Sequence, residues 1–428
     1  MGLRLVIATL GSLGDLHPFV AVARALKARG HDPVMAVPED HLAKCRAAGL
    51  TAVRAFPSYR ELLAAQGLDE AQSIRAVMQS SDYLIRRILL PALAESTAVI
   101  HAQADGADGV IVSPFALGGV IAAEARGLPL INGVLQPMSL MSACEPPRTP
   151  DFRMMIAAPR GRAGRAWNRA MLEVIGLELR RRYSPVINAV RRSWGLAPMR
   201  AAPLFAQEVP PRLTLALYAR SFAPAPPDAP PNTQVVGFPR FDSDSGGPEF
   251  LSPDLKAFLA KGEAPLVFTL GSFAVYAPGD FYGRSLKAAR LLNRRSVLLI
   301  GPEGASPGDL GDDVHVAAYA PHSLLFPGAA AIVHHGGVGT TGQALHAGRP
   351  QLITPHMGDQ PDNAARISDL GVGATLSAAR YRPERVARLL HRLLMDPDTL
   401  RRAEALADRL SGENGAVAAA AAIEAALP

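Results

Sequence analysis

The chain has 428 residues, of which 49% are hydrophobic and 19% are charged. This length exceeds one ordinary core and suits two domains, and the composition excludes a disordered or fibrous protein. Its two cysteines, Cys45 and Cys144, exclude a disulfide framework and a four-cysteine zinc site, and they suit a reducing cytoplasm.

The formal net charge is +6, and many arginines lie between residues 160 and 192. A nucleic-acid-binding surface would interleave aromatic side chains with this charge, but only 6% of the residues are aromatic, so we expect no nucleic-acid partner. Two interpretations of the arginines stay open: solvated helix faces, or a patch that brings the protein to an anionic membrane, such as the inner membrane surface, or to an acidic acceptor. The N-terminus lacks a signal peptide, and the most apolar stretch, Gly109 to Ala123, is too short to cross a bilayer, so we expect a cytoplasmic protein, soluble or membrane-peripheral.

The first half of the chain alternates predicted strands with predicted helices. A buried strand is expected at Leu3 to Thr9, followed by the turn Gly11-Ser-Leu-Gly14 and a helix from about Pro18 to Arg29. Further strands are expected at Pro33 to Val37 and at Gly109 to Val112. Strands that alternate with helices predict βαβ units and a parallel sheet.

After a proline-rich stretch at residues 224–231 and a polar run at 242–248, the alternation starts again. The second set of strands is expected at Leu266 to Leu270, Ser296 to Ile300, Ala331 to Val333 and Gln351 to Thr354, and the alanine-rich tail from Glu413 to Leu427 predicts a final helix.

We therefore predict an α/β fold with two Rossmann-like domains, residues 1–237 and 251–408, joined by a linker at 238–250. A C-terminal helix within residues 409–428 is expected to cross back to the first domain. Ligands of such sheets bind outside the carboxyl ends of the strands, so two facing sheets create one cleft between them.

The most informative segment is His334-His-Gly-Gly-Val-Gly-Thr340, which joins a predicted strand to a predicted helix. Glycines at a helix N-terminus let backbone N–H groups approach a ligand, and the helix dipole favours negative charge there. Either His334 or His335 can donate a hydrogen bond to a diphosphate. A departing nucleoside diphosphate develops negative charge, and hydrogen-bond donors held in place stabilise that charge.

A second polar loop follows the next predicted strand. Asp359 and Gln360 lie at the carboxyl end of that strand, where a carboxylate and an amide can bind sugar hydroxyls, and Asn363 lies on the helix that begins at Pro361. Each segment alone is equally consistent with an ordinary helix start, because glycine turns before helices are common.

Together the segments resemble the signature of the family 1 glycosyltransferases, whose GT-B fold has two Rossmann-like domains around a central cleft. The bacterial members carry His-His-Gly-Gly-x-Gly-Thr followed by Asp-Gln-x-x-Asn-Ala, as in Asp359-Gln-Pro-Asp-Asn-Ala364. The turn Gly11-Ser-Leu-Gly-Asp-Leu-His-Pro18 also matches, so the resemblance covers nearly the whole chain. Within the family, the chain is most similar to the second-chain rhamnosyltransferases of rhamnolipid synthesis and to bacterial sterol-type and glycopeptide glycosyltransferases.

This resemblance implies a donor site in the second half. It implies that His334 contacts the diphosphate, that Asp359 and Gln360 hold the sugar, and that Tyr319 replaces a tryptophan that stacks on the nucleobase. The other donor-binding residues that it implies are His335, Gly337, Gly339 and Thr340 beside the diphosphate, Asn363 and Ser272 at the phosphates, and the backbone of Ala320 at the base edge. Many relatives that use UDP-sugars place a glutamate on the ribose hydroxyls where this chain has Gly342, which favours a dTDP donor and still leaves UDP tolerated.

Transfer with inversion needs a base that takes the proton of the acceptor hydroxyl. Aligned on its closing Pro18, the first turn has Asp15 where many relatives have a histidine base, so the resemblance implies that Asp15 is the base. The later strand tip, Val112-Ser-Pro-Phe115, lacks the aspartate that orients this histidine in those relatives, which agrees with a carboxylate working alone. His17 on the same turn is the rival base. Helix capping by Asp15 and simple exposure of His17 are the structural alternatives.

The acceptor is expected in the first half, near Phe115, Leu117, Met138 and Met141. Methionine-rich apolar lining suits a bulky hydrophobic acceptor, although such stripes also occur in plain cores.

We therefore predict an inverting glycosyltransferase, with dTDP-rhamnose favoured over UDP-glucose as donor, a hydrophobic small molecule or lipid as acceptor, and no cofactor beyond the nucleotide sugar. No metal site is expected, and we interpret Asp242-Ser-Asp244, which has the spelling of a manganese-binding motif, as solvated linker. The alternatives are a nucleotide-sugar epimerase of similar fold, an NAD-dependent oxidoreductase, disfavoured because neither half has a clean Gly-x-Gly-x-x-Gly, and a non-catalytic activator of a partner glycosyltransferase.

Overall fold

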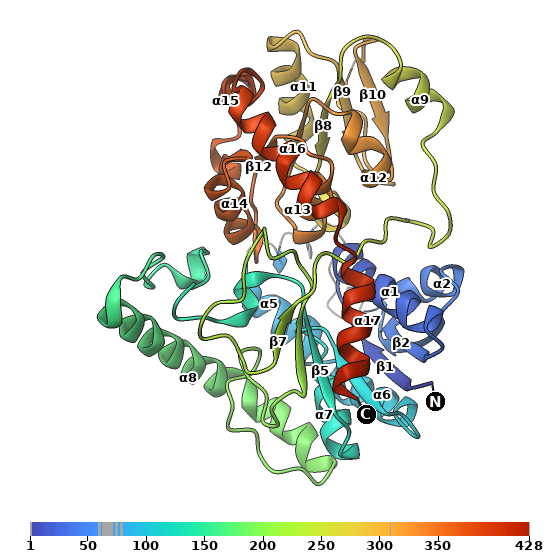
Figure 1. Cartoon of the computed structure of the whole chain (residues 1–428), viewed down its shortest axis with the longest axis vertical. Coiled ribbons are helices and arrows are strands. Elements are labelled where there is room, and N and C mark those ends of the chain that lie inside the picture. Colours follow the sequence, from blue (N-terminus) through green and yellow to red (C-terminus); the bar gives the residue numbers. More distant parts are fainter. Residues whose placement is uncertain are drawn as a thin grey trace.

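The computed structural model describes residues 2–58, 61, 72, 76–77, 80–308 and 310–427. These residues form two parallel sheets, each with helices packed around it, one above the other along the long axis of the molecule (Figure 1). The predicted α/β fold, two Rossmann-like units facing across a central cleft, is confirmed.

The first sheet has the strand order β3-β2-β1-β4-β5-β6-β7, and its neighbouring strands are parallel. The strands are β1 (Arg4–Ala8), β2 (Asp32–Pro38), β3 (Thr51–Phe56), β4 (Gly109–Val112), β5 (Leu130–Val134), β6 (Leu213–Ala216) and β7 (Thr233–Val235). The accompanying helices are α1 (Leu13–Ala28), α2 (Glu39–Ala47), α5 (Ser81–Leu84), η1 (Ile85–Leu89), α6 (Leu93–Gln103), α7 (Leu117–Arg126), η2 (Pro137–Leu140), η3 (Pro150–Phe152) and α8 (Gly161–Ser193).

The second sheet has the order β10-β9-β8-β11-β12-β13 and is also parallel. Its strands are β8 (Leu266–Thr269), β9 (Ser296–Leu299), β10 (Val314–Ala317), β11 (Ala331–His334), β12 (Gln351–Ile353) and β13 (Gly373–Thr375). Its helices are α9 (Pro253–Leu259), α10 (Gly271–Ala274), α11 (Phe281–Leu291), α12 (His322–Leu325), η4 (Phe326–Gly328), α13 (Val338–His346), α14 (Gln360–Asp369), η5 (Ala378–Arg380), α15 (Pro383–Met395) and α16 (Pro397–Ser411).

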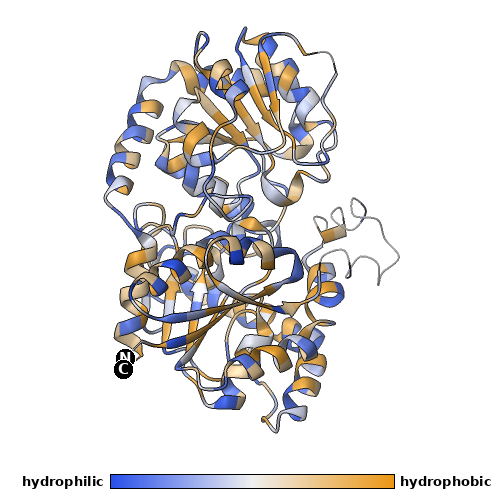
Figure 2. Cartoon of the chain, turned by 90° about the vertical axis from the view of Figure 1, so that its right-hand side faces the viewer, coloured by the Kyte–Doolittle hydropathy of each residue, from blue (hydrophilic) through white to orange (hydrophobic). Residues whose placement is uncertain are grey.

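The inner strands of both sheets are buried on both faces, which explains their continuous apolar sequences. All residues of β4, β6, β8, β9 and β11 are buried, as in sheets that helices cover on two sides. Figure 2 shows the same arrangement, with hydrophobic strands in the interior of each half and mixed polar and apolar helices around them.

Helix α1 begins earlier than the sequence predicts. Its first residue is Leu13, so Pro18 lies inside the helix rather than at its start. The carboxylate of Asp15 accepts a hydrogen bond from the backbone N–H of Ser12 over 2.9 Å, and this reciprocal cap stabilises the earlier start. Pro18 therefore lies in the second turn, where its missing N–H removes the one intrahelical hydrogen bond that this residue would donate.

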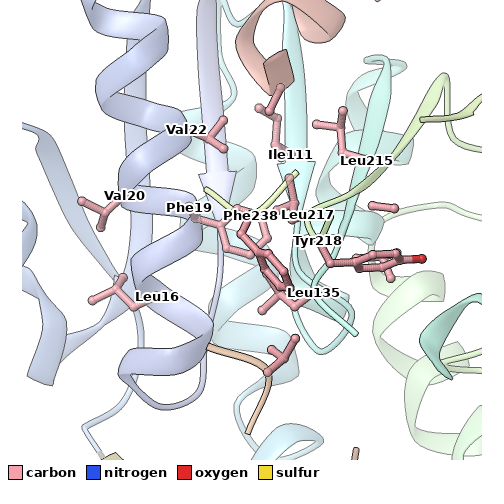
Figure 3. Close-up of a cluster of buried hydrophobic side chains, with 14 of the residues drawn as sticks. Leu16, Phe19, Val20, Val22, Ile111, Leu135, Leu215, Leu217, Tyr218 and Phe238 are labelled. Carbon is pink, nitrogen blue, oxygen red and sulfur yellow. The ribbon is translucent and has the colours of Figure 1, made fainter. Parts of the chain in front are cut away.

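The last helix, α17 (Gly415–Ala426), packs against α1 at the other end of the chain. Glu424 of α17 accepts hydrogen bonds from Arg29 and His31, which follow α1. One buried cluster extends from the first sheet to helices of the second half, and Figure 3 shows its centre, where Phe19 of α1 lies with Leu135, Leu217 and Phe238. Apolar packing therefore joins the two halves behind the cleft.

Candidate active site

A cleft of about 1170 Å³ lies between the carboxyl ends of the two sheets. The loops after β1 and β4 form part of one wall, and the loops after β8 and β11 form part of the other. β1 and β4 are neighbours at the point where the strand order of the first sheet reverses, and β8 and β11 are the equivalent neighbours in the second. Ligands of open α/β sheets bind at these reversal points, so the two strand orders determine the position of the cleft.

The glycine-rich turn after β11 brings a helix N-terminus to this cleft. α13 begins at Val338, and Gly337, Gly339 and Thr340 line the cleft as predicted for a binding loop. A Cβ atom at Gly339 would lie 3.6 Å from Cα of Gly14, so the N-termini of α13 and α1 meet at close range. Backbone N–H groups and the helix dipole make this end of α13 a site for a negative group.

The two histidines of this turn have different surroundings. His334 is fully buried, its Nδ1 accepts a hydrogen bond from the N–H of Gly336, and its Nε2–H therefore donates to Oε1 of Gln351 over 2.9 Å. The prediction that His334 contacts the diphosphate is wrong, because both ring nitrogens are bonded within the protein and the side chain does not line the cleft.

His335 lies on the cleft wall instead. A Cβ atom at Gly271 would lie 2.4 Å from its Cε1, and one at Gly337 would lie 2.4 Å from its Nε2, so two glycines make the room for the ring. Burial lowers the pKa of His335 well below its usual range, and the neighbouring His334 and His356 add to this effect. The ring is therefore neutral near pH 7 and keeps one N–H to donate.

Asp359 lies on the same wall, where Asn363 orients it. Nδ2 of Asn363 donates to Oδ2 of Asp359 over 2.6 Å and to the carbonyl of Gly336 over 2.9 Å. Burial raises the pKa of Asp359 to about 7, the hydrogen bond from Asn363 opposes this, and the charge of Asp15 raises the pKa further. Asn363 itself is buried behind the wall, so it positions Asp359 and the glycine turn and does not line the cleft near the phosphates as predicted.

Two further predicted donor residues, Gln360 and Ser272, also line the cleft. Oε1 of Gln360 accepts hydrogen bonds from the N–H groups of His356 and Met357, which fixes the loop before α14. Ser272 lies in α10, the short helix that follows β8.

Asp15 faces this donor side from the first half of the chain. Its Oδ2 accepts hydrogen bonds from the N–H and the Oγ of Ser12, over 2.9 and 3.2 Å. Gly11 makes room for the carboxylate, since a Cβ atom there would lie 2.3 Å from Oδ2. Burial raises the pKa of Asp15 to about 6, and the hydrogen bonds from Ser12 oppose that rise. The carboxyl group thus caps α1 and also lines the cleft with a pKa suited to a proton acceptor.

His17, the rival base, also lines the cleft but lies against the linker. Its ring packs edge-on against Phe241, with 5.3 Å between the ring centroids. Burial lowers the pKa of His17 to about 4, and the charge of Asp242 opposes this change. His17 is neutral near pH 7, so it is able to accept a proton only as a weak base.

Tyr319 lines the cleft at the end of β10, and the linker holds it there. Its hydroxyl donates to Oδ1 of Asp242 over 2.9 Å, and the N–H of Ser323 donates to Oδ2 of the same carboxylate. The interpretation of Asp242 as solvated linker is therefore wrong, because this carboxylate connects the linker to the second half and lines the cleft. Ala320 is buried and does not line the cleft.

Farther along α13, Gly342 and Gln343 differ in where a side chain at each position points. Gly342 is buried, and a Cβ atom there would lie 3.0 Å from the ring of Phe238, so a side chain at this position would point at the linker. Gly342 and the next residue, Gln343, both line the cleft, but only Gln343 brings a side chain to it. Sequence reasoning missed Gln343 because no motif singles out this residue.

The opposite end of the cleft is apolar. All four predicted acceptor residues line it: Phe115, Leu117, Met138 and Met141. The sequence did not predict the contribution of η1 and α8, whose apolar lining residues are Ile85, Ile88, Leu89, Ile175 and Leu179. These residues follow ordinary helical spacing, which cannot distinguish a cleft wall from a core.

An ion-pair cluster connects the loop that carries Met141, the predicted acceptor loop, to α14. Asp362 of α14 is fully buried, accepts a hydrogen bond from the backbone N–H of Arg148 over 3.0 Å, and pairs with Arg366 over 2.8 Å. The guanidinium of Arg148 also bonds Asp369, and Arg366 lies 3.6 Å from Glu145. Arg148 and Glu145 belong to the loop that carries Met141, so this cluster couples the two walls. No motif indicates it, because its members are far apart in the chain.

Among the described residues, no three His, Cys, Asp or Glu side chains gather in a way that could hold a metal ion. In the same part of the chain, every helix is too short or too polar to cross a membrane.

Comparison with known proteins agrees with this geometry. Residues 297–423 match the family described as "Erythromycin biosynthesis protein CIII-like, C-terminal domain". The chain is 30% identical to O-mycaminosyltylonolide 6-deoxyallosyltransferase of Streptomyces fradiae over 99% of its own length and 97% of that protein. It is also 30% identical to vancomycin aglycone glucosyltransferase of Amycolatopsis orientalis, over 97% of its own length and 96% of that protein.

Among solved structures, the chain is similar to the spinosyn rhamnosyltransferase SpnG complexed with thymidine diphosphate, with a TM-score of 0.66, 22% identity and coverage of 99% and 100%. At 22% identity, this likeness shows the fold alone. The two relatives found by sequence are 30% identical along nearly the whole chain. The strand order reverses within each of the two Rossmann-like sheets, and a glycine-rich helix start lies on one wall of the cleft between them. Glycosyltransferases match the sequence along nearly its whole length. The chain therefore belongs to the family 1 glycosyltransferases of the GT-B fold.

Proposed function

We propose that this glycosyltransferase moves a sugar from a dTDP-sugar, such as dTDP-rhamnose, to a hydroxyl group of an apolar small molecule or lipid, with inversion at the anomeric carbon. The donor class is supported by the thymidine diphosphate bound to the structural relative SpnG. The acceptor class is supported by the apolar end of the cleft and by the names of the relatives, which glycosylate a tylonolide and a vancomycin aglycone.

The second half would bind the donor. The N–H groups at the start of α13 and the neutral ring of His335 would donate to the diphosphate. Asp359 would accept hydrogen bonds from the sugar hydroxyls, and Nε2 of Gln360, whose Oε1 is already bonded to backbone N–H groups, would donate to them. Tyr319, held by Asp242, would stack on the base. In this assignment His335 replaces His334, and Gln343 replaces Gly342 as the residue nearest the ribose.

The first half would supply the base. The acceptor oxygen attacks the anomeric carbon from the face opposite the diphosphate, its proton passes to the carboxylate of Asp15, and the bond from carbon to the diphosphate oxygen breaks. Both hydrogen bonds from Ser12 fall on Oδ2 of Asp15, so we assign Oδ1 to the acceptor hydroxyl. The diphosphate leaves with its new negative charge next to the start of α13.

One observation carries this proposal: Asp15 and the start of α13 face each other across one cleft. Gly339 of α13 lies against Gly14, the residue before Asp15, and the charge of Asp15 raises the pKa of Asp359 on the opposite wall. A base and a site for the leaving group thus lie within reach of a single sugar.

Asp15→Asn tests the assignment. We expect kcat to fall by about three orders of magnitude, within the range of a lost general base, while the thermal shift on adding dTDP stays as in the wild type. His17→Gln is the matched control from the same turn and keeps most of the activity. Full turnover in Asp15→Asn would refute the role of Asp15, and a large loss in His17→Gln alone would transfer it to His17.

A panel of dTDP- and UDP-sugars, each with and without an apolar acceptor alcohol, tests the reaction class and the donor. We expect product only with an acceptor, and a larger thermal shift with dTDP than with UDP. Conversion of a sugar nucleotide without acceptor would favour an epimerase, and absence of donor binding would favour a non-catalytic activator.

A further inference from the structure

The outer face of α8 carries apolar side chains that no other described element covers. Figure 1 shows α8 along one side of the lower half, with its first part at the edge of the molecule. The exposed fractions are 46% for Trp167, 59% for Val174 and 61% for Leu177. Together with the exposed Ala163 and Ala170, these residues recur every three or four positions, so they form one stripe along the helix.

The turn before α8 adds two more exposed apolar residues, and hydrogen bonds hold it beside Trp167. Met154 is 67% exposed and Ile156 44% exposed. The indole N–H of Trp167 donates to the carbonyl of Met154 over 2.9 Å. The buried amide of Asn168 accepts from the N–H of Ile156 and donates to its carbonyl, over 2.8 and 3.0 Å. Apolar residues that are exposed and also fixed in place form a preorganised contact surface.

A row of arginines runs along the same helix, about a third of a turn around from this stripe. Arg162, Arg165 and Arg169 are exposed, follow helical spacing, and form no ion pair with a described residue. Residues 153–182 contain eight arginines and two glutamates, a net charge of +6, which equals the formal charge of the whole chain. The remaining residues therefore balance, and the positive charge is concentrated next to the apolar stripe.

We propose that this surface, defined as Met154, Ile156, Trp167, Val174 and Leu177 with the arginine row, docks the enzyme on an anionic lipid bilayer. Apolar side chains would enter the interface between headgroups and acyl chains, and the arginines would contact the lipid phosphates. A two-fold pairing of two copies through this face would bring the arginine rows close together, and nucleic acid would leave the apolar stripe without a partner.

The docked orientation brings the bilayer close to the apolar end of the cleft. The inner face of α8 carries Ile175, Leu179 and Tyr183, which line the cleft, while the stripe lies on its outer face. One helix would thus contact lipid on one side and the acceptor site on the other. The docking itself does not depend on the proposed donor or base.

Vesicle co-sedimentation tests the proposal with the full chain, using phosphatidylcholine vesicles with and without about one third phosphatidylglycerol. We expect strong binding only to the anionic vesicles and loss of binding at about 1 M salt, where charges are screened. Arg162→Glu/Arg165→Glu/Arg169→Glu should lower the partition coefficient by about a hundredfold or more, since each arginine near the surface contributes about a factor of five.

The matched control reverses three exposed arginines on α15 of the other half, Arg382→Glu/Arg385→Glu/Arg388→Glu, and makes the same change in net charge. It should bind within about threefold of the wild type, because those residues lie outside the docking face. Equal loss in both variants, or no preference for anionic vesicles, would overturn the proposal.

Trp167 provides a direct probe, because the chain has only one other tryptophan, Trp194, which packs against His101. Anionic vesicles should shift the fluorescence maximum to shorter wavelength in the wild type and not in Trp167→Phe, which should still bind. Trp167→Ser/Leu177→Ser should bind anionic vesicles weakly. If that variant instead turned a dimer into a monomer in sedimentation, the stripe would belong to a second copy and the proposal would fail.

Discussion

The two walls of the cleft use different kinds of contact. The wall from the second half carries glycines, a helix start and polar side chains that hydrogen bonds hold in place, as Asn363 holds Asp359. The wall from the first half is apolar over part of its area, which Met138 and Met141 line together with residues of η1 and α8. Asp15 lies on the polar part of that wall, which Ser12 and His17 also line.

In the proposed function, this difference follows from what each wall would have to recognise. A diphosphate presents fixed charges that backbone N–H groups and one neutral histidine can match only in a narrow geometry. An apolar acceptor is recognised by shape and buried area, which many side chains supply equally well. We therefore expect substitutions on the donor wall to have large and general effects, and substitutions on the acceptor wall to have small effects that depend on the acceptor.

Gly337→Ala tests the narrow tolerance of the donor wall and, apart from Asp15→Asn, should have the largest effect. Gly337 has a negative φ that alanine adopts readily, but the new Cβ atom would lie 2.4 Å from Nε2 of His335. Displacing this ring by about 1 Å should lower kcat by about a hundredfold and reduce the thermal shift on adding dTDP. Gly328→Ala, where a Cβ atom meets nothing within 4 Å, is the control. Equal behaviour of the two variants would contradict the role of His335.

The pH profile distinguishes the two candidate bases. Because burial raises the pKa of Asp15 to about 6, this carboxyl is ionised above pH 6 and neutral below it. We expect kcat/KM to fall about tenfold for each pH unit below 6, measured with an acceptor that does not titrate. His17, with a pKa lowered to about 4, would instead give a fall near pH 4 that disappears in His17→Gln.

Arg148→Ala tests the coupling between the walls. It leaves the buried carboxylate of Asp362 with Arg366 as its guanidinium partner, so the acceptor loop should loosen and Tm should fall by several degrees. We expect the acceptor KM to rise by about tenfold, with dTDP binding unchanged by calorimetry. Arg153→Ala, an exposed residue a few positions later, should change neither value. A parallel loss of donor and acceptor binding would mean that the cluster supports the fold and does not position the loop.

Met138→Ala tests the tolerance of the acceptor wall and should have the smallest effect. Removing part of one flexible apolar side chain should change the acceptor KM by less than about tenfold, in a direction that depends on acceptor size. Met395→Ala, at a position 68% exposed on α15, is the control. A general loss of turnover for every acceptor would contradict this view of the wall.

Local pattern predicted most of the fold. The buried strands, the glycine-rich start of α13, the helix at the C-terminus and the cleft between the sheets follow from periodicity and turn chemistry. The start of α1 was placed too late, because Pro18 gave a stronger signal than the cap formed by Ser12 and Asp15. The candidate site was predicted as a set of loops. The four residues predicted to bind the acceptor line the cleft, and their role stays a prediction.

The sequence by itself determined which loops meet, because strand order and glycine turns depend on local conformational preferences. Only the tertiary structure decided which histidine faces the cleft, since His334 and His335 are adjacent and the bond from His334 to Gln351 on the neighbouring strand β12 turns one ring inward. Only the tertiary structure likewise brings Asp242 to the hydroxyl of Tyr319, and the backbone N–H of Arg148 to Asp362. These contacts join residues from distant parts of the chain, and a local pattern carries no information about such partners.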